Sequence, residues 1–388
     1  MTSGGTANNA EWQPSLESVT EIQHATNNYP YTALLGLYAL ATDQLQGALP
    51  NITVDVFGRT VRMGNFAGGE FWTDNPAWCV MDFLTHARYG LGVPDAEIDL
   101  GAFTAWAAYC EEIFADERRH TLNYALDRDV RAQQALLEMM GGSRTLLFKS
   151  EGLWTPRPTR NDAPVQLLSW ANCTDLKLTY TRDAERVNVI EARFANEEQG
   201  FEQDVLTWPT LENWPTEVRK TSLEVRGVTK PSRIMRAMQF ELNRRRWENL
   251  SLEMTCALDA IVLQPHDLFR FSHPLPGWGK SGRLQAGSTA SFLYLDNPVL
   301  FSGVQSYIVY VRHEDGTTEV KPVSYPGDAQ QTTLTLLSPL SQTPVPRTSL
   351  WAFGHLVGPA DTAVKVFRVV RMQRMSDTTV RIQAMIHN

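Results

Sequence analysis

The pattern of apolar and polar residues changes twice along this chain, from strand-like to helical and back. Alternating apolar residues predict a strand over Asn51–Phe57, and Gly58 predicts a turn before a second strand at Thr60–Met63. Between about residues 75 and 141, apolar residues recur every three or four positions, the spacing of amphipathic helices. Later residues are again typical of strands, with one further helix. The pattern predicts an α+β fold that is mostly β.

The first helical stretch, Asn75 to Gly92, carries its own start and stop signals. Asn75 can accept a hydrogen bond from a free backbone N–H, and Pro76 suits the first helical position because it has no N–H to leave unpaired. One face carries apolar residues at helical spacing: Ala77, Val80, Met81, Leu84 and Ala87. We expect Gly90 and Gly92 to end this helix.

Three further helices are predicted. The second carries Phe103, Trp106, Cys110 and Ile113 on one face. The third runs from about Asp127 to Met140 and stops at Gly141-Gly142. The fourth begins at Pro231, with Ile234, Met238 and Leu242 on one face.

Strand patterns occupy most of the chain after residue 143. Alternation is clear in three sets: Leu176, Leu178 and Tyr180; Ile190, Ala192 and Phe194; and Val380, Ile382, Ala384 and Ile386. Similar runs occupy 254–263, 304–312 and 364–372. Short strands broken by Gly, Pro and Asp after about residue 249 predict an antiparallel barrel or sandwich.

These changes of pattern predict several domains, as expected for 388 residues. We divide the chain into a flexible N-terminal arm (1–18), a β-rich segment (19–72), a helical insertion (73–142), a second β-rich segment (143–230), and a helix followed by a β-barrel (231–388).

Charge and hydropathy exclude some functions. The net charge of −8 and the pI of about 5.6 argue against a dedicated nucleic-acid binder. No run of apolar residues is long enough to span a bilayer. Met1 to Ser15 is polar and lacks the pattern of a signal peptide. The four cysteines, Cys79, Cys110, Cys173 and Cys256, are widely scattered, so we expect buried free thiols and synthesis in a reducing cytoplasm.

No catalytic, metal or cofactor site is predicted. The eight histidines show no helical pair and no alternating strand pair, so zinc is not expected. Glu111-Glu112 and Glu197-Glu198 are sequence neighbours, and side chains adjacent on a helix diverge too far to flank one bond. The sequence also lacks a nucleophile elbow, a phosphate loop and a dinucleotide fingerprint. Gly277 to Gly282 is better explained as a β-hairpin loop than as a phosphate cradle.

One basic cluster is present. It lies on the fourth helix and consists of Arg233, Arg236, Arg244, Arg245 and Arg246. Nucleic-acid binding is one interpretation, but Glu241, Glu248 and Glu253 interrupt or follow the cluster. A solvated face, or one that pairs with an acidic neighbouring subunit, explains it better. These arginines and Trp278, an aromatic type enriched at interfaces, are our candidate interface residues.

Several stretches resemble, in the right order, signatures of the phage tail-tip attachment protein J family. Asn75 to Gly92 carries the strongest resemblance, and Asn28 to Gly36 resembles the family's entry segment. Arg233 to Arg246 resembles the helix that leads into a strand, here Leu258 to Asp267. The family more often has Gly where His266 stands. Pro274 to Arg283 is similar to a glycine-rich turn of several hub proteins.

The resemblance implies a central hub at the distal tip of a non-contractile phage tail. It implies a multi-domain tail hub with antiparallel β-barrel domains and a small helical insertion, assembled as a homotrimer around the tail channel. It also implies a structural role without enzymatic activity or cofactor, gating DNA passage. The implied partners are the distal tail protein ring, the tape measure protein, other tail-tip proteins, and fibres or receptor-binding proteins. Sequence-specific nucleic-acid binding and a transmembrane segment are not implied. The implied location is the virion, after synthesis in the bacterial cytoplasm.

Two alternatives remain open. The chain could be the hub of a phage-tail-like injection device, which would share the same architecture. It could instead be a tail-associated wall-degrading enzyme, which two carboxylates roughly 5–9.5 Å apart or a Cys–His pair would favour. Unlike long members of the family, the sequence stops at Asn388 just after a strand. Either receptor contact is made by other proteins, or the sequence is part of a longer product.

Overall fold

The computed structural model describes residues 54, 56–64, 69–182, 186–210, 213, 215–357 and 360–387. The chain divides into two units, Met1–Val56 and Phe57–Asn388, and every element below belongs to the second. The predicted arm and the Asn28–Gly36 segment lie outside the described residues, as does part of the predicted strand Asn51–Phe57. The described members of that strand, residues 54, 56 and 57, are not in a strand, whereas β1 (Thr60–Arg62) is present and pairs with β2 (Glu70–Trp72).

The first three predicted helices are confirmed, with shifted ends. They are α1 (Pro76–Thr85), α2 (Leu100–Glu111) and α3 (Ala132–Gly141). The Asn75 side chain accepts a hydrogen bond from the Ala77 N–H at 3.0 Å, as the capping pattern predicts. Helix α1 ends at Thr85, so Ala87 is exposed and outside it. Gly90 is required for close approach, since a Cβ there would lie 1.9 Å from the Phe83 carbonyl oxygen.

These helices share one core. Its large side chains include Met81, Phe103 and Trp106, all at most 1% exposed. The hairpin of β5 (Thr145–Ser150) and β6 (Leu153–Pro158) packs against it through Leu147 and Trp154. Short elements complete the region: η2 (Asp95–Glu97), β3 (Ile113–Phe114) and β4 (Glu117–Arg118). Ile113, predicted on the second helix, lies instead in β3 and is exposed.

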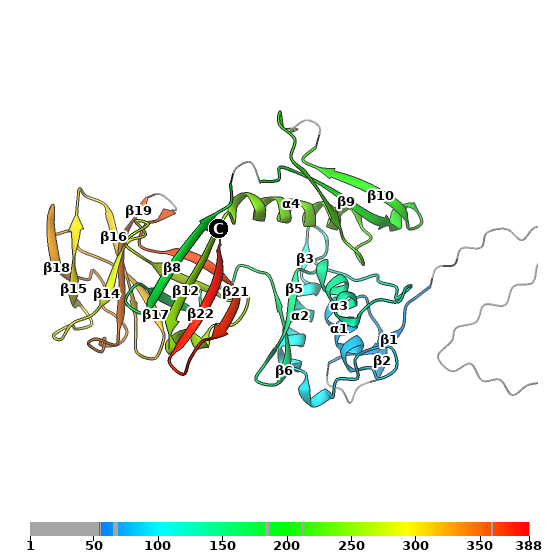
Figure 1. Cartoon of the computed structure of the whole chain (residues 1–388), viewed down its shortest axis with the longest axis horizontal. Helices are drawn as coiled ribbons and strands as arrows, with labels where there is room; N and C mark the ends of the chain where they lie inside the picture. Colours follow the sequence, from blue (N-terminus) through cyan, green and yellow to red (C-terminus); the bar gives the residue numbers. More distant parts are fainter. Residues whose placement is uncertain are drawn as a thin grey trace, which may run out of the picture. The chain divides into compact units, whose positions relative to one another are not determined.

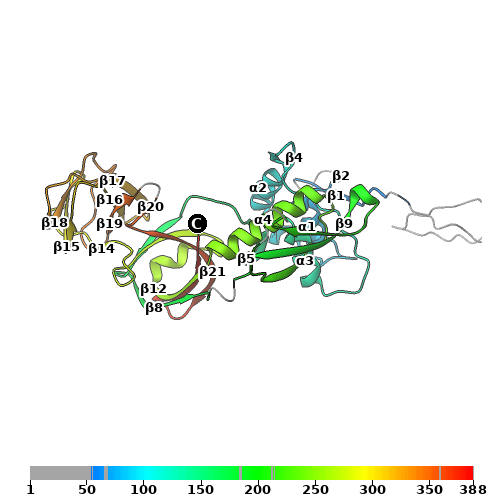
Figure 2. The same ribbon diagram turned by 90° about the horizontal axis from the view of Figure 1, so that it is seen from above.

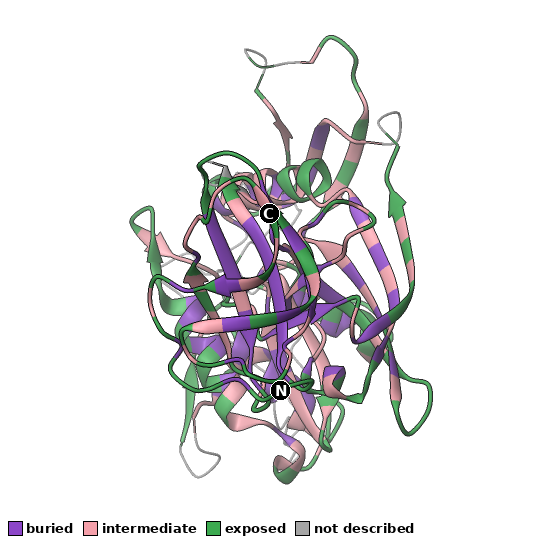
Figure 3. Cartoon of the chain, turned by 90° about the vertical axis from the view of Figure 1, so that its left-hand side faces the viewer, coloured by how far each residue is buried: buried purple, intermediate pink, exposed green. Residues whose placement is uncertain are grey.

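A six-stranded sheet is built from three distant parts of the sequence (Figure 1). Its strands are β7 (Gln166–Ser169), β8 (Cys173–Tyr180), β12 (Leu250–Ala257), β13 (Leu268–Ser272), β21 (Lys365–Arg374) and β22 (Thr379–Ile386). The order is β7-β13-β21-β22-β12-β8, parallel only between β7 and β13. Alternating residues of these strands are buried together, as the period of two requires (Figure 3).

Two insertions interrupt that sheet in sequence. The first is a three-stranded sheet of β9 (Val189–Asn196), β10 (Glu202–Trp208) and β11 (Lys220–Glu224), with η4 (Glu197–Gln199) after β9. The predicted fourth helix, α4 (Pro231–Trp247), follows and lies along this sheet (Figure 2). Ile234 and Met238 of α4 are fully buried, and they share one apolar cluster with Ile190 and Phe194 of β9.

The second insertion is a barrel. The sequence predicted a barrel or sandwich over all residues after about 249, whereas β12, β13, β21 and β22 of that range belong to the six-stranded sheet instead. The strands of the barrel are β14 (Lys280–Arg283), β15 (Phe292–Phe301), β16 (Ser306–Arg312), β17 (Thr318–Pro322), β18 (Ala329–Thr335) and β19 (Leu350–Val357), with β20 (Ala360–Asp361) beside β19. Hydrogen-bonded strand pairs give the order β14-β19-β16-β17, and β15 pairs separately with β18. Two bridges, Leu284↔Leu295 and Val323↔Leu336, join the two sets and close the ring. Trp351, fully buried, lies in its core.

A buried ion pair links the barrel to the six-stranded sheet region. Arg312 of β16 donates through Nη1 to Oδ2 of Asp259 at 2.6 Å. Asn172 also donates to that carboxylate oxygen, at 3.0 Å. The Arg312 side chain is 10% exposed and the Asp259 side chain 33%. The pair therefore joins one well-buried group to one that water still reaches.

The strand predicted over Leu258–Asp267 is wrong. The segment begins with a 3₁₀ helix, η6 (Leu258–Val262), and then turns. Leu258, Ile261 and Val262 are exposed, so the apolar run does not mark a buried strand. His266 has a φ of +70°, the left-handed region that favours glycine. The residue type differs from the family pattern, but the backbone has the conformation that a glycine there would adopt.

Candidate functional site

Helix α4 carries all the candidate interface residues except Trp278. Its first position is Pro231, and Ile234 and Met238 fix one face against the three-stranded sheet. Helical spacing then turns Arg233 and Arg236 towards β4 and the loop after it.

Arg233 and Arg236 are partnered within the chain. Arg236 Nη2 lies 2.9 Å from Oε1 of Glu117, and Arg233 Nε lies 3.6 Å from Oε2 of the same carboxylate. The Arg233 guanidinium also donates to the hydroxyl of Thr121. Ser232 donates to Glu117 at 2.8 Å. These contacts fasten the start of α4 to β4, so both arginines have a structural role before any partner is considered.

The arginines at the other end of α4 remain accessible. Arg244 and Arg245 bind Glu241 one turn back, at 2.9 and 2.7 Å, and all three arginines there are exposed. Burial would raise the pKa of Glu241, but hydrogen bonds from Arg244 and Arg245 outweigh it and lower that pKa. The Arg246 guanidinium lies over the Trp247 ring, 5.0 Å from its centroid. This end of α4 is available to another subunit, and its interface role stays a prediction.

Trp278 lies elsewhere, in the hairpin loop predicted from the glycine-rich stretch. His273 and Trp278 form a β-bridge across that loop, and Gly277 has a φ of +76°. The indole is 8% exposed and packs against Phe271 and Phe367, with ring centroids 6.3 and 5.6 Å away. Trp278 therefore belongs to the core of the six-stranded sheet, and little of it is left for a partner to contact.

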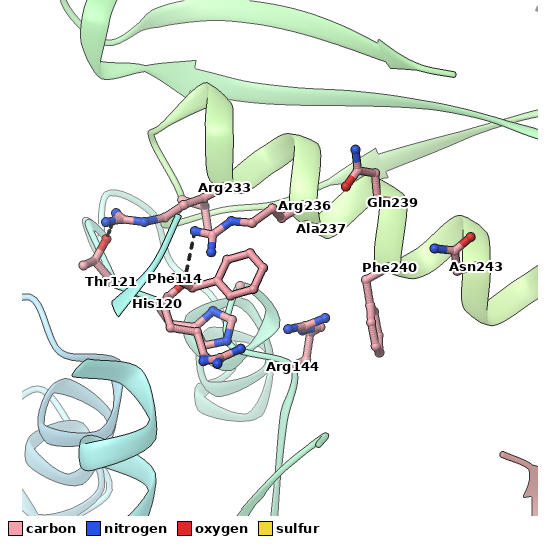
Figure 4. Close-up of a pocket in the computed structure, with 13 residues that line it drawn as sticks. Phe114, His120, Thr121, Arg144, Arg233, Arg236, Ala237, Gln239, Phe240 and Asn243 are labelled. Atoms are coloured by element: carbon pink, nitrogen blue, oxygen red, sulfur yellow. Dashed lines mark hydrogen bonds between the residues drawn. The ribbon is translucent and has the colours of Figure 1, made fainter. Parts of the chain in front are cut away.

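A cavity of about 250 Å³ opens beneath α4 (Figure 4). From the helix, Arg233, Arg236, Gln239, Phe240 and Asn243 line it. Phe114 of β3 and the segment Arg119–Thr121 form a second wall. Arg144, at the junction of α3 and β5, forms a third. We call this cavity the arginine pocket, after Arg119, Arg144, Arg233 and Arg236.

The electrostatics of the arginine pocket are strongly positive. Burial, followed by the charges of Arg144, Arg236, Arg119 and Arg233, lowers the pKa of His120 to about 3. His120 is therefore neutral at physiological pH. Burial also lowers the pKa of Arg144 and of Arg233, since it disfavours their charged forms.

The cysteines are not prepared for nucleophilic chemistry. All four are free thiols, as predicted. Burial raises the pKa of Cys79 to about 12 and raises that of Cys110 and Cys173 as well. A thiol with so high a pKa stays protonated at neutral pH and is a poor nucleophile. Cys173 and Cys256 lie opposite each other on β8 and β12, with sulfurs 2.8 Å apart, a proximity the sequence did not predict.

Across the described ranges, no group of three His, Cys, Asp or Glu residues is arranged to hold a metal ion. Within those same ranges, no helix is both long and apolar enough to cross a bilayer.

Sequence reasoning missed the arginine pocket because its walls come from three distant segments. Arg118-Arg119-His120 is a short basic run that could have been noticed. No local pattern links it to Arg144 or to α4, since only the fold brings them together.

Comparison with known proteins places this geometry in a class. Residues 131–286, which include β5–β13 and α4, match the family described as putative phage tail protein. This part of the chain is thus similar to phage tail proteins. Within that class the chain is similar to tip attachment protein J of Escherichia phage SECphi27, with 22% identity over 229 residues. The alignment covers 53% of this chain and 19% of that protein's length. The resemblance expected from the sequence is confirmed.

Solved structures with related arrangements also come from tails and virions. One is the virion of a native gene transfer agent particle, with a TM-score of 0.44 and 10% identity, covering 80% of this chain and 47% of that chain. Another is a tail protein from Neisseria meningitidis MC58, with a TM-score of 0.33 and 12% identity, covering 68% and 58%.

Proposed function

We propose that the chain is a structural subunit of a phage-type tail and forms the central hub at its distal tip. In this role it links the tail tube and tape measure protein to the host-recognition apparatus and gates the passage of DNA. The observation that carries the proposal is the similarity to a tip attachment protein. The match of residues 131–286 to a tail protein family supports the tail-protein part of the proposal and does not bear on the position at the tip.

The hub is a homotrimer in this proposal, with the distal tail protein ring and fibres or receptor-binding proteins as neighbours. A ring around a channel closes with one kind of interface when its subunits obey cyclic symmetry. With −8 per chain, three copies carry about −24, which disfavours tight binding of the DNA that must slide past. Arg233 and Arg236 are consistent with weak DNA binding, because their shared partner Glu117 offsets part of their positive charge.

The proposed role is non-enzymatic. The raised pKa values of Cys79, Cys110 and Cys173 argue against a thiol nucleophile. The neutral, recessed His120 has arginines around it and no carboxylate or thiol bound to its ring among the described residues, so it lacks the partner that a general base needs.

A symmetric reconstruction of purified particles tests the hub assignment. We expect three copies of the chain at the end of the tail distal to the capsid. Density for the chain along the tube, in the capsid, or in a single copy within an intact tail would refute the proposal. Particles that lack the chain should end in an open or incomplete tip, and a normal tip in such particles would refute it equally.

A further inference from the structure

The arginine pocket contains more positive charge than the chain itself neutralises. Two carboxylates pair with three of its four arginines. Arg119 binds Glu112 at 2.9 Å, while Arg233 and Arg236 share Glu117. The fourth, Arg144, makes no ion pair and no side-chain hydrogen bond with any described residue. Four positive and two negative charges leave an excess of two, in a chain whose overall charge is negative.

Arg144 is held in place although nothing pairs with it. It has a φ of +53°, an unfavourable conformation for a residue with a side chain. Its guanidinium lies over the Phe240 ring, 4.0 Å from the centroid, and Figure 4 shows it below α4. A guanidinium held over an aromatic face keeps N–H groups free to donate to a ligand. Arg144 is therefore pre-positioned for a ligand that accepts hydrogen bonds.

Individual nitrogens of other side chains around the pocket also lack a hydrogen-bond partner in the described part of the chain, although Arg233 and Arg236 are paired through their other contacts. Nε of Arg233, Nε of Arg236 and Nε2 of His120 are buried without any hydrogen-bond partner. A buried donor without an acceptor costs free energy, so such groups are rarely left unused. The two arginine nitrogens and Arg144 are thus donors without oxygen acceptors among the residues described, next to the apolar rings of Phe114 and Phe240, and His120 adds a further donor in the tautomer protonated at Nε2.

We propose that the arginine pocket is an oxyanion-binding site that accepts the carboxylate of an acidic side chain from a neighbouring tail subunit. A planar guanidinium matches a carboxylate through two parallel hydrogen bonds. The pocket, at about 250 Å³, admits a side chain and not a duplex. Its arginines converge on one recess, whereas a DNA-binding surface spreads its charges along a stripe. The identity of the neighbour as a tail subunit rests on the proposed function.

The test uses the isolated full chain and a fluorescent hexaglutamate peptide, with hexaglutamine and a short DNA duplex as parallel probes. We expect hexaglutamate to bind and hexaglutamine not to bind. Arg144→Gln should weaken hexaglutamate binding about tenfold or more, the effect of losing one charge-assisted hydrogen-bonding partner. Arg374→Gln removes the same charge from an exposed arginine remote in sequence and should leave binding within about twofold.

A second variant keeps the test decisive if Arg144→Gln folds poorly. Gln239→Glu places a carboxylate at the pocket wall and should both weaken hexaglutamate binding and raise the melting temperature, because it supplies the missing anion from within. Absence of hexaglutamate binding, equal losses in Arg144→Gln and Arg374→Gln, or tighter Arg144-dependent binding of the duplex would overturn the proposal. These results are distinct from the hub test. A trimer at the tail tip with no peptide binding refutes only the pocket assignment, and peptide binding by a chain located elsewhere refutes only the hub.

Discussion

The ion pair between Asp259 and Arg312 gives a prediction that depends on unequal burial. Arg312 is 10% exposed, and its other acceptor among the described residues is weak, because the Leu167 carbonyl oxygen lies 3.5 Å from Nη1. Asp259 is 33% exposed and keeps a hydrogen bond from Asn172. Removing the carboxylate therefore strands a buried cation. Removing the guanidinium leaves a partly exposed carboxylate whose Oδ2 keeps the hydrogen bond from the Asn172 amide, although its Oδ1 is buried without a partner within the described ranges.

The two truncations should differ in their cost. Breaking a fully buried pair costs roughly 3–5 kcal/mol, and the partial exposure of Asp259 reduces this. We expect Asp259→Ala to lower the free energy of unfolding by about 2–3 kcal/mol. Arg312→Met keeps most of the buried volume and removes the charge that most needs its partner. We expect it to cost about 1 kcal/mol.

Urea unfolding, followed by intrinsic fluorescence and by circular dichroism, measures both effects. The double variant completes the cycle and should cost less than the sum, because it leaves no buried charge alone. Asp377→Ala is the matched control, since it breaks a pair whose carboxylate is 98% exposed, and it should change stability little. A cost for Arg312→Met equal to or above that of Asp259→Ala would refute the reasoning from burial.

Two other outcomes follow from the side-chain environments. In the native protein, Cys79 should react only slowly with a thiol reagent at pH 8, because its pKa is about 12. Denaturation without reductant should expose four reactive thiols. A count of two reactive thiols would contradict this and show that Cys173 and Cys256 are oxidised to a disulfide. Burial would raise the pKa of Glu319, but hydrogen bonds from Ser341, Lys321 and His313 hold it near 2, below its value of about 4.3 in the unfolded chain. A lowered folded-state pKa stabilises only while the carboxylate is charged, so Glu319→Gln should be less stable than the natural chain at pH 6, and the difference should shrink as the pH falls from about 4.5 towards 2. Melting curves of both chains across this range check the prediction, and a difference that grows towards low pH would contradict it.

Local signals predicted local structure well in this chain. The cap at Asn75, the buried face of α4 and the alternation along Val380–Ile386 each depend on neighbours within a few residues, and the structure contains all three. The predictions were wrong where contacts between distant parts of the chain determine the local structure. The segment Leu258–Val262 forms a 3₁₀ helix in which Leu258, Ile261 and Val262 are exposed, and only Ala260 is fully buried in the core of the six-stranded sheet.

The candidate site was predicted in part for the same reason. The basic face of α4 is visible in the sequence, but its intramolecular partner Glu117 is more than a hundred residues away. Trp278 looked like an interface aromatic, since composition alone does not distinguish a core tryptophan from an exposed one. Arg144 carries no pattern at all. Its importance depends on a backbone conformation and on the approach of Phe240, which only the folded chain supplies.

The order of strands in the six-stranded sheet has a consequence for synthesis. β21 and β22 are the last strands in sequence, yet they occupy the two middle positions of the sheet. As the chain leaves the ribosome, β7 can pair with β13, and β8 with β12, while the barrel closes on itself between β13 and β21. The two strand pairs stay separate, with open edges and exposed apolar faces, until residues 365–386 emerge and the β21–β22 hairpin enters between them. A nascent chain therefore cannot complete this sheet until residues 365–386 have been made, and a chain interrupted before them exposes unpaired strand edges that a chaperone or protease can recognise.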